Sequence, residues 1–400
     1  MSTSITRFFH HQFDLKYGCN PHQNPAAIYS LQNRELPFEV LNGKPGYINL
    51  LDAMNSWQLV QELDKTADLP AAASFKHVSP AGAAVAVPLD DTLKQVYECS
   101  QQELSDLATA YIRARGADPM SSFGDFIALS RTVDTATAQI IKPAVSDGII
   151  APDYAPEALE ILKAKKKGSY VILKVNPGYL APDMEYREVF GVGFAQKSND
   201  LVLGEDNLFQ HIPTEIKDMP TDAKRNLILA AVTLKYTQSN SVGYALDGQM
   251  IGIGAGQQSR IDCTKLAGKK AENWFLRQHP KVLGLPFKSE IKRVERTNAR
   301  VCYIEGDMTA REMDAWQQNF NSVPPALTDE EKSSWLEKMS RVCLASDAFF
   351  PFRDNIDQAS KRGVSYIVQP GGSVRDDDVI QAANDYGMVM AFSKIRLFHH

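Results

Sequence analysis

The stretch from Asp147 to Val175, DGIIAPDYAPEALEILKAKKKGSYVILKV, indicates the fold class. It begins with a short apolar run, passes through a proline-marked turn into a helical pattern, and ends in the β-branched run Tyr170–Val175. This order and length are typical of a β-α-β unit, whose two strands are parallel. A second unit is predicted over Gly363–Phe392, with Pro370-Gly371-Gly372 at its strand-to-helix turn. The sequence therefore predicts an α/β protein with mixed or parallel sheets flanked by helices.

The composition is that of a globular chain. Its 400 residues are 44% hydrophobic and 23% charged, which predicts a sizeable core in two or three domains, or in one domain of two lobes. The net charge of −5 argues against broad nucleic-acid binding, and no apolar run reaches the ~18–20 residues of a membrane helix. No HExxH motif is present, nor an H-x-E motif with a downstream PCxxC, so zinc-dependent hydrolysis and deamination are disfavoured. Five scattered cysteines argue against a disulfide framework and favour reduced thiols in the cytoplasm: Cys19, Cys99, Cys263, Cys302 and Cys343.

The segment Ser74–Val85, SFKHVSPAGAAV, places a lysine and a histidine side by side after an apolar run. On a continuing strand Lys76 and His77 would face opposite sides, so both can reach one ligand only if the strand ends there. The Ser-Pro-Ala-Gly that follows supplies that break, and strand ends are where open α/β sheets place ligands. An imidazole can accept a proton while an ammonium group stabilises developing negative charge. A solvent-exposed dipeptide without a role is the alternative.

Several other segments allow two interpretations. Gln249–Arg260, QMIGIGAGQQSR, is either a weak dinucleotide fingerprint or a glycine-rich strand that another backbone approaches, and no clear helical pattern follows it. Lys235–Val242, KYTQSNSV, is either a polar pocket wall or ion cage, or a capped loop. Ser346–Asn355, SDAFFPFRDN, is either a slot for a flat aromatic ring or a corner of the core. Asn319–Glu331 is a linker or a helix–helix connection, and a helix is predicted to begin after its Thr328.

Taken together, these segments resemble one family along nearly the whole chain. They are KYGCNPHQNPAAIY, LNGKPGYINLLDAMNSWQLV, AAASFKHVSPAGAAV, RARGADPMSSFGDFIALS, VSDGIIAP, KYTQSNSV, IGIGAGQQSRIDCTKLAG, SDAFFPFRDN and the terminal RLFHH. They are similar to the transformylase part of the bifunctional purine-biosynthesis family, which joins AICAR transformylase to IMP cyclohydrolase. In that family the cyclohydrolase part normally comes first, so the resemblance implies a stand-alone AICAR transformylase.

The resemblance also implies an architecture. It predicts two cytidine-deaminase-like lobes without zinc, each discontinuous in sequence: approximately 1–185 plus 279–340, and approximately 186–278 plus 341–400. It further predicts a homodimer whose active sites lie at the subunit interface.

The reaction implied is transfer of the formyl group of 10-formyltetrahydrofolate to the 5-amino group of AICAR, which gives FAICAR and tetrahydrofolate. His77 matches the family's base, Lys76 its partner, and Asn240 a residue that orients the reacting groups. A purine-nucleotide-binding regulator that keeps the pocket without the chemistry is the alternative.

The resemblance extends to binding residues. The positions implied at AICAR are Lys16, Tyr17, Gly124, Asp147, Arg260, Phe349 and Arg396. Those at the folate are Ile261, Asp354, Ser373 and Val374, although Ser373 is alternatively only the N-cap of the next helix, with Asp376 at the third helical position. A structural potassium ion is implied near Thr237, Ser239, Ser241 and Asp347. The family usually has Arg where this chain has Lys16, so the charge is kept but the bidentate fork is lost.

Overall fold

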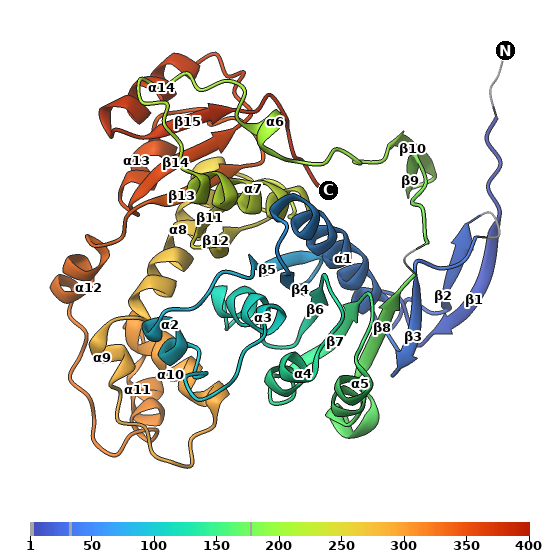
Figure 1. Cartoon of the computed structure of the whole chain (residues 1–400), viewed down its shortest axis with the longest axis horizontal. Helices are drawn as coiled ribbons and strands as arrows, with labels where there is room; N and C mark the ends of the chain where they lie inside the picture. Colours follow the sequence, from blue (N-terminus) through green and yellow to red (C-terminus); the bar gives the residue numbers. More distant parts are fainter. Residues whose placement is uncertain (1–3, 32–33, 177) are drawn as a thin grey trace.

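The computed structural model describes residues 4–31, 34–176 and 178–400. Its centre is an eleven-stranded mixed sheet (Figure 1). Strands β13 to β15 are parallel to one another, as are β6 to β8, and the other neighbouring pairs are antiparallel. The strands in spatial order are β15 (Val389–Phe392), β14 (Val364–Gln369), β13 (Val342–Ser346), β11 (Val242–Leu246), β12 (Gln249–Gly254), β5 (Ser79–Val85), β4 (Ala71–Lys76), β6 (Asp125–Leu129), β7 (Ser146–Ala151), β8 (Val171–Val175) and β3 (Phe38–Asn42).

Both predicted β-α-β units are confirmed. Strands β7 and β8 are parallel neighbours connected through α5 (Pro156–Lys163), and β14 and β15 are parallel neighbours connected through α14 (Asp376–Asp385). Most residues of these strands are buried, as expected for parallel strands that are covered on both faces. The mixed α/β architecture flanked by helices is therefore confirmed.

Two hydrophobic cores lie on opposite faces of the main sheet, because successive strand residues point to opposite sides. Ala72 packs in the first core, for example, while its neighbours Ala71 and Ala73 pack in the second. The second core is covered by α1 (Tyr47–Ala67) and α7 (Thr221–Lys235). The first core is covered by α5 and α14 together with α3 (Asp106–Ala117), α4 (Thr135–Ile141), α8 (Arg260–Leu276) and α13 (Asp354–Ser360).

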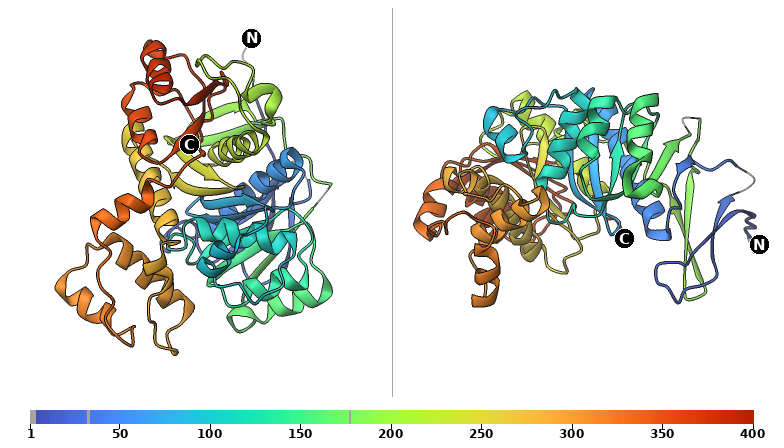
Figure 2. Two further views of the ribbon diagram at one scale, coloured as in Figure 1. Left: turned by 60° about the vertical axis from the view of Figure 1, so that its left-hand side comes forward. Right: turned by 90° about the horizontal axis from the view of Figure 1, so that it is seen from below.

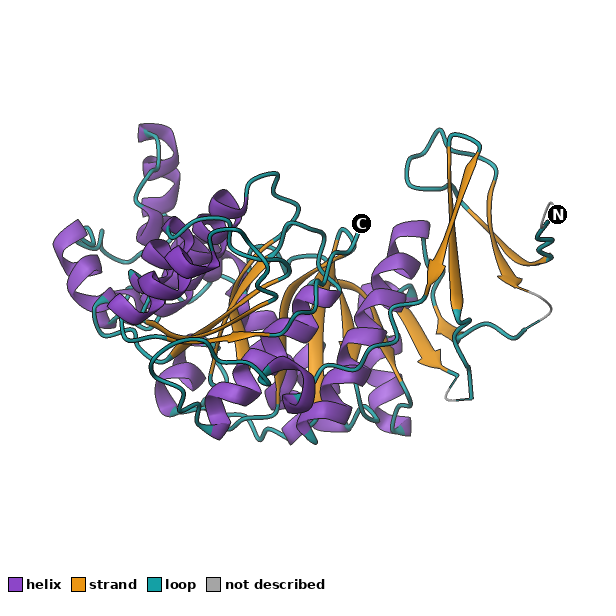
Figure 3. Cartoon of the chain, turned by 90° about the horizontal axis from the view of Figure 1, so that it is seen from above, coloured by secondary structure: helices purple, strands orange, loops and turns teal. Residues whose placement is uncertain are grey.

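Smaller units lie at the two ends of the molecule (Figures 1 and 2). At one end, four helices enclose a third core: α9 (Pro280–Leu283), α10 (Arg293–Glu305), α11 (Ala310–Gln317) and α12 (Asp329–Leu336). At the other end stand two antiparallel hairpins, β1 (Phe9–Leu15) with β2 (Ala26–Leu31) and β9 (Met184–Val189) with β10 (Val192–Lys197), as Figure 3 shows. The remaining elements are short: α2 (Asp91–Val96), α6 (Glu205–Leu208) and the 3₁₀ helix η1 (Lys165–Gly168).

The segment Asn319–Glu331 connects α11 to α12. Of its two interpretations, the helix–helix connection is therefore the correct one. Thr328 is the N-cap of α12, as predicted: its hydroxyl accepts from the Glu331 amide at 3.2 Å, and the Glu331 carboxylate accepts from the Thr328 amide at 2.9 Å. The main sheet is continuous through the pairing of β12 with β5, where Gln249 lies opposite Ala84. The division into two discontinuous lobes stays a prediction.

The glycines of β12 are explained by the close approach of α8. A Cβ atom on Gly252 would lie 2.1 Å from the carbonyl oxygen of Ala267, and one on Gly254 would lie 2.5 Å from that of Cys263. Gln249–Arg260 is therefore a glycine-rich strand that another backbone approaches, and not a dinucleotide fingerprint. A helix does follow, although the sequence shows no clear helical pattern there, because α8 begins at Arg260. Its buried face consists largely of small residues such as Ala267 and Ala271, which give a weak apolar signal in the sequence.

Candidate active site

One edge of the main sheet gathers the polar segments that the sequence predicts to be functional. Strands β4, β12, β13, β14 and β15 end at this edge, and β6, β7 and β11 begin there, as their registers require. The loops, strand ends and first helical residues at this edge include Lys76, His77, Gly124, Asp147, Asn240, Arg260, Phe349, Asp354, Ser373 and Arg396. The predicted strand end at Lys76 is confirmed, but β6 and β7 contribute their amino ends because β6 runs antiparallel to β4.

A tight hairpin presents the Lys–His pair. Strands β4 and β5 are joined by His77 and Val78, whose φ angles are 54° and 61°. Positive φ at both central residues is the geometry of a type I′ turn, and it is unfavourable for a β-branched residue such as Val78. Lys76 is half-buried, whereas His77 is exposed. The turn therefore presents an accessible imidazole beside an ammonium group.

Asp52 of α1 lies beneath this turn and was not predicted from the sequence. Its carboxylate Oδ1 accepts a hydrogen bond from the Val78 amide at 2.7 Å, and its side chain is buried. Burial raises the pKa of Asp52 to about 6, while the Val78 amide and the nearby His77 act in the opposite direction. In the sequence Asp52 lies within a stretch of mostly apolar residues, so the local sequence gave no sign that its carboxylate would hold the Val78 amide. It fixes the strained turn that carries His77.

Replacing Asp52 by Asn is expected to change how stability depends on pH. The folded pKa lies above the usual 3.8, so the carboxyl's contribution to folding is fully present below about pH 4 and is lost as the pH rises through about 6. Asn keeps a side-chain acceptor for Val78 but does not titrate. The free energy of unfolding of Asp52→Asn should therefore gain about 2–3 kcal/mol on that of the parent between pH 4 and pH 7.5.

Denaturant unfolding at several pH values measures this difference. Asp91→Asn, at an exposed carboxylate in α2, is the control and should show little pH-dependent change relative to the parent. A difference between Asp52→Asn and the parent that stays constant with pH would contradict the prediction.

Lys76 contacts the loop that begins β6. Its ammonium group donates to the carbonyl of Phe123, and the next residue, Gly124, has a φ of 77° and donates its amide to Val145 at 2.9 Å. A Cβ atom on Gly124 would lie 4.0 Å from the Lys76 ammonium, so this turn and the lysine are close neighbours. Asp147, at the start of β7, pairs with Lys166 at 2.6 Å. The two side chains are 47% and 41% exposed, so both remain accessible to a ligand.

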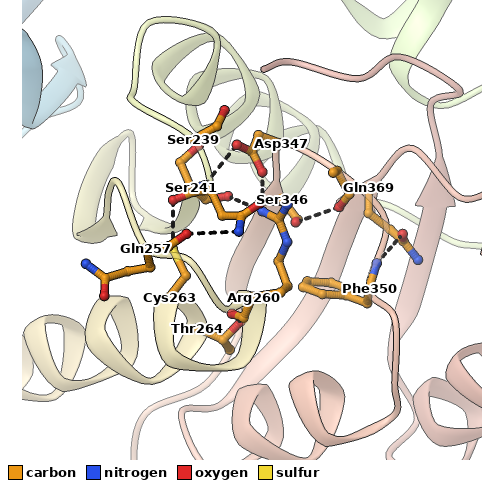
Figure 4. Close-up of polar contacts among 12 residues, drawn as sticks. Ser239, Ser241, Gln257, Arg260, Cys263, Thr264, Ser346, Asp347, Phe350 and Gln369 are labelled. Atoms are coloured by element: carbon orange, nitrogen blue, oxygen red, sulfur yellow. Dashed lines mark hydrogen bonds and ion pairs between the residues drawn. The ribbon is translucent and has the colours of Figure 1, made fainter. Parts of the chain in front are cut away.

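A second group of polar residues, separate from the Lys–His hairpin, is centred on the paired side chains of Arg260 and Asp347 (Figure 4). The Arg260 guanidinium pairs with the buried Asp347 carboxylate, and it donates to the Ser241 carbonyl at 3.1 Å and to the Asn240 side-chain oxygen at 2.7 Å. The Asn240 amide nitrogen donates in turn to the Gln257 carbonyl at 2.9 Å. Asn240 and Ser241 of the segment Lys235–Val242 therefore belong to this centre, with Asn240 held in place by Arg260. The ion cage stays a prediction.

Hydrogen bonds join the Lys–His hairpin, the Arg260–Asp347 centre and the C-terminal end of the chain. The Gln238 amide donates to the Ser79 hydroxyl at 3.4 Å, which connects the Asn240 segment to the Lys–His hairpin. The Ser239 amide donates to the His399 carbonyl at 3.0 Å, and the Leu397 amide donates to the Asp347 carbonyl at 2.8 Å. The segment that carries Arg396 is thus attached to the same edge.

Comparison with known proteins assigns the chain to a family. The family model described as AICARFT/IMPCHase bienzyme matches residues 1–270. The chain belongs to the AICARFT/IMPCHase bienzyme family.

Similar members of the AICARFT/IMPCHase family carry the name "Bifunctional purine biosynthesis protein PurH". The one from Elusimicrobium minutum is 33% identical over 398 residues, which are 98% of this chain and 59% of that protein. Those from Xanthomonas campestris pv. campestris and Magnetococcus marinus are each 32% identical, and the matches cover 97% and 96% of this chain and 58% and 59% of those proteins. The chain thus spans about three fifths of the length of these relatives.

The aromatic segment Ser346–Asn355 of this family member is in part a corner of the core, and the slot for a flat aromatic ring stays a prediction. Phe350 is fully buried, while Phe349 and Phe352 are exposed at the edge of the sheet. Ile261 and Asp354 are half-buried, and they lie in the first turns of α8 and α13 respectively. Ser373 is not an N-cap: Arg375 holds that place in α14, and the Asp376 carboxylate accepts from the Ser373 amide at 3.1 Å. Val374 is fully exposed.

Two predicted residues of this family member lie away from the edge of the main sheet. Lys16 and Tyr17 follow β1 in the separate β1–β2 hairpin, and both side chains are exposed. Within the described residues, the polar contacts do not join them to Arg396, whose guanidinium lies over the Phe398 ring. A shared phosphate site for these three residues stays a prediction.

Among the side chains that the structure describes, no group of three or more His, Cys, Asp or Glu could hold a metal ion. No helix within residues 4–31, 34–176 and 178–400 is both long enough and apolar enough to cross a membrane.

Proposed function

We propose that this chain transfers the formyl group of 10-formyltetrahydrofolate to the 5-amino group of AICAR, giving FAICAR and tetrahydrofolate. The observation that carries the proposal is the exposed His77 beside Lys76, on a hairpin bonded to the Asn240 segment, in a member of the AICARFT/IMPCHase family. Relatives named for purine biosynthesis support it. A regulator that only binds a purine nucleotide would not need a base on a strained turn.

The chemistry requires a base, because the AICAR amine is a weak nucleophile whose lone pair is delocalised into the ring. His77 accepts the amine proton as the nitrogen bonds to the formyl carbon. Lys76 stabilises the oxyanion of the tetrahedral intermediate and supplies a proton to the departing folate nitrogen. The new C–N bond to AICAR replaces the C–N bond to the folate, so atoms and charge balance. Asn240 orients the reacting groups from its place beside Arg260.

The substrate contacts are proposed from the same edge. Asp147 is accessible to ribose hydroxyls, and the exposed Phe349 offers an aromatic face to the carboxamide end of AICAR. The full proposed AICAR set is Lys16, Tyr17, Gly124, Asp147, Arg260, Phe349 and Arg396. The proposed folate set is Ile261, Asp354, Ser373 and Val374, in which Asp354 accepts hydrogen bonds from the pterin.

Lys16→Arg is expected to lower the KM for AICAR by a few-fold. Arg offers two parallel N–H donors to a phosphate, whereas Lys offers a point charge. Lys16 is exposed, so the exchange should not disturb folding. Steady-state kinetics of the two proteins measure the effect, and an unchanged KM would remove Lys16 from the phosphate site.

A structural potassium ion fits the centre around Asp347. The hydroxyl of Ser241 is buried and has no hydrogen-bond partner among the described residues, and the Ser241 amide donates to the Asp347 carboxylate at 2.9 Å. Thr237 and Asp347 are fully buried. Thr237, Ser239, Ser241 and Asp347 would hold the ion, which would give the unpartnered Ser241 hydroxyl oxygen a cation to coordinate. The melting temperature should be higher in potassium chloride than in lithium chloride at equal ionic strength, and equal values would refute the site.

Two further properties belong to the proposal. A homodimer with active sites at the interface predicts a molar mass of twice 44.4 kDa in sedimentation, and a monomer that remains fully active would refute it.

A cytoplasmic location agrees with five unpaired cysteines, and fractionation of cells tests it.

The reaction itself is tested by mixing the purified chain with AICAR and 10-formyltetrahydrofolate and following tetrahydrofolate. We expect turnover that stops when AICAR is omitted. If a folded protein binds AICAR but forms no tetrahydrofolate, the regulator is favoured instead.

A further inference from the structure

A cavity of about 120 Å³ lies between α3, the segment after α4, and α10. None of the residues proposed above for AICAR, folate or catalysis is among those that line it in this described region. Phe123 lies between the two sites, because it lines the cavity and its carbonyl accepts from Lys76. The cavity is therefore a neighbour of the candidate active site and not a part of it.

Positive charge dominates the lining. Four arginines line the cavity beside one carboxylate, that of Glu98, and they are Arg115, Arg277, Arg293 and Arg300. Arg115 is paired with the buried carboxylate of Asp125, which lies outside the lining. Glu98 is already occupied, since it accepts from Arg300 at 2.7 Å and from Arg296 at 2.6 Å. The Arg277 guanidinium donates to the backbone carbonyls of Gly116 and Ala117, not to a carboxylate. Arg293 donates to the Tyr97 carbonyl at 2.6 Å and lies 3.9 Å from Glu98. The cavity thus has the charge to bind an anion.

Buried donors along the lining lack acceptors. The Tyr111 hydroxyl, the Arg277 Nε and the Arg300 Nε have no hydrogen-bond partner among the described residues, although Arg115 lies close to Tyr111. Tyr111 is only 2% exposed, and burial raises its pKa to about 12, so it keeps its proton at neutral pH. A buried donor left without an acceptor is costly, so a ligand that brings an acceptor is favoured here.

Most of the remaining lining is apolar, although Thr297 and Asn298 also belong to it. Ile112, Pro119, Ile140 and Val294 are among the apolar residues that line it. The volume is close to that of an engineered cavity of about 150 Å³ that binds benzene. A single ring therefore fits.

We propose that this cavity binds a small organic anion that consists of a single aromatic ring with one carboxylate. The ring packs against the apolar wall, and the carboxylate accepts from the Tyr111 hydroxyl and the arginines. This inference does not rest on the proposed formyl transfer.

Calorimetric titration of the whole chain with benzoate, benzamide and inorganic phosphate tests the proposal. Benzoate should bind with a dissociation constant below about 1 mM and at least about 10-fold more tightly than benzamide, its neutral counterpart. Tyr111→Phe and Arg293→Gln should each weaken benzoate binding about 10-fold, as expected for hydrogen bonds to a charged group. Arg131→Gln is a matched control, because the Arg131 side chain is 46% exposed against 43% for Arg293, and it should bind like the parent.

Thermal unfolding without ligand separates binding from folding. Tyr111→Phe should melt at or above the parent, because the hydroxyl that it removes has no partner in the described structure. Absence of saturable benzoate binding would show that water alone fills the cavity and overturn the proposal. Equal affinities for benzoate and benzamide, tighter binding of phosphate, or unchanged binding by the folded variants would also overturn it.

Discussion

Replacing His77 by alanine is expected to lower kcat/KM for formyl transfer to AICAR by about 10²–10⁴-fold, the usual contribution of a positioned general base. His77 is exposed at the tip of a hairpin, and the Val78 amide next to it is held by Asp52, so the imidazole can be removed without opening the core. The loss should therefore appear in kcat, with the melting temperature and AICAR binding close to those of the parent.

His10→Ala provides the control for this experiment, because His10 is also exposed but lies on β1, in the separate β1–β2 hairpin. It should keep the activity of the parent. If His77→Ala retains more than about a tenth of that activity, another group acts as the base. If both the activity and the AICAR affinity disappear, His77 serves binding more than proton transfer.

Replacing Lys235 by methionine is expected to lower the free energy of unfolding by about 3–5 kcal/mol, because it leaves a buried carboxylate without its cation. Lys235 and Glu62 lie 2.8 Å apart, with side chains 3% and 6% exposed. Glu62 also accepts from the Tyr236 hydroxyl at 2.9 Å and from the Leu203 amide at 3.0 Å. The pair joins α1 to α7 at the first residue of the segment Lys235–Val242, so its loss should also loosen the part of the site that carries Asn240.

Lys224→Met is the matched control, since Lys224 lies on the same helix and pairs with Glu205 at 2.7 Å on the surface. An exposed pair of this kind contributes about 0–1 kcal/mol. Denaturant unfolding at neutral pH compares the two variants. Similar losses for Lys224→Met and Lys235→Met would contradict the assigned importance of burial.

The sequence predicted the features that depend on neighbours along the chain. The two β-α-β units follow from apolar runs and turn residues within about 30 positions, which is the range over which such a unit is built. The Thr328 capping box and the strand end at Lys76 are equally local. Helix α8 was missed because small residues pack closely without giving a strong apolar pattern.

The sequence by itself determined the α/β class, the strand end at the Lys–His pair and, through its resemblance, the family. Only the tertiary structure decided which residues meet. Asp52 lies beneath Val78 although the two are 26 positions apart, and Arg260 reaches Asp347 across 87 positions. Such contacts are set by the order and direction of strands in the sheet. Those depend on the packing of two cores against opposite faces, and a local pattern of residues does not encode that packing.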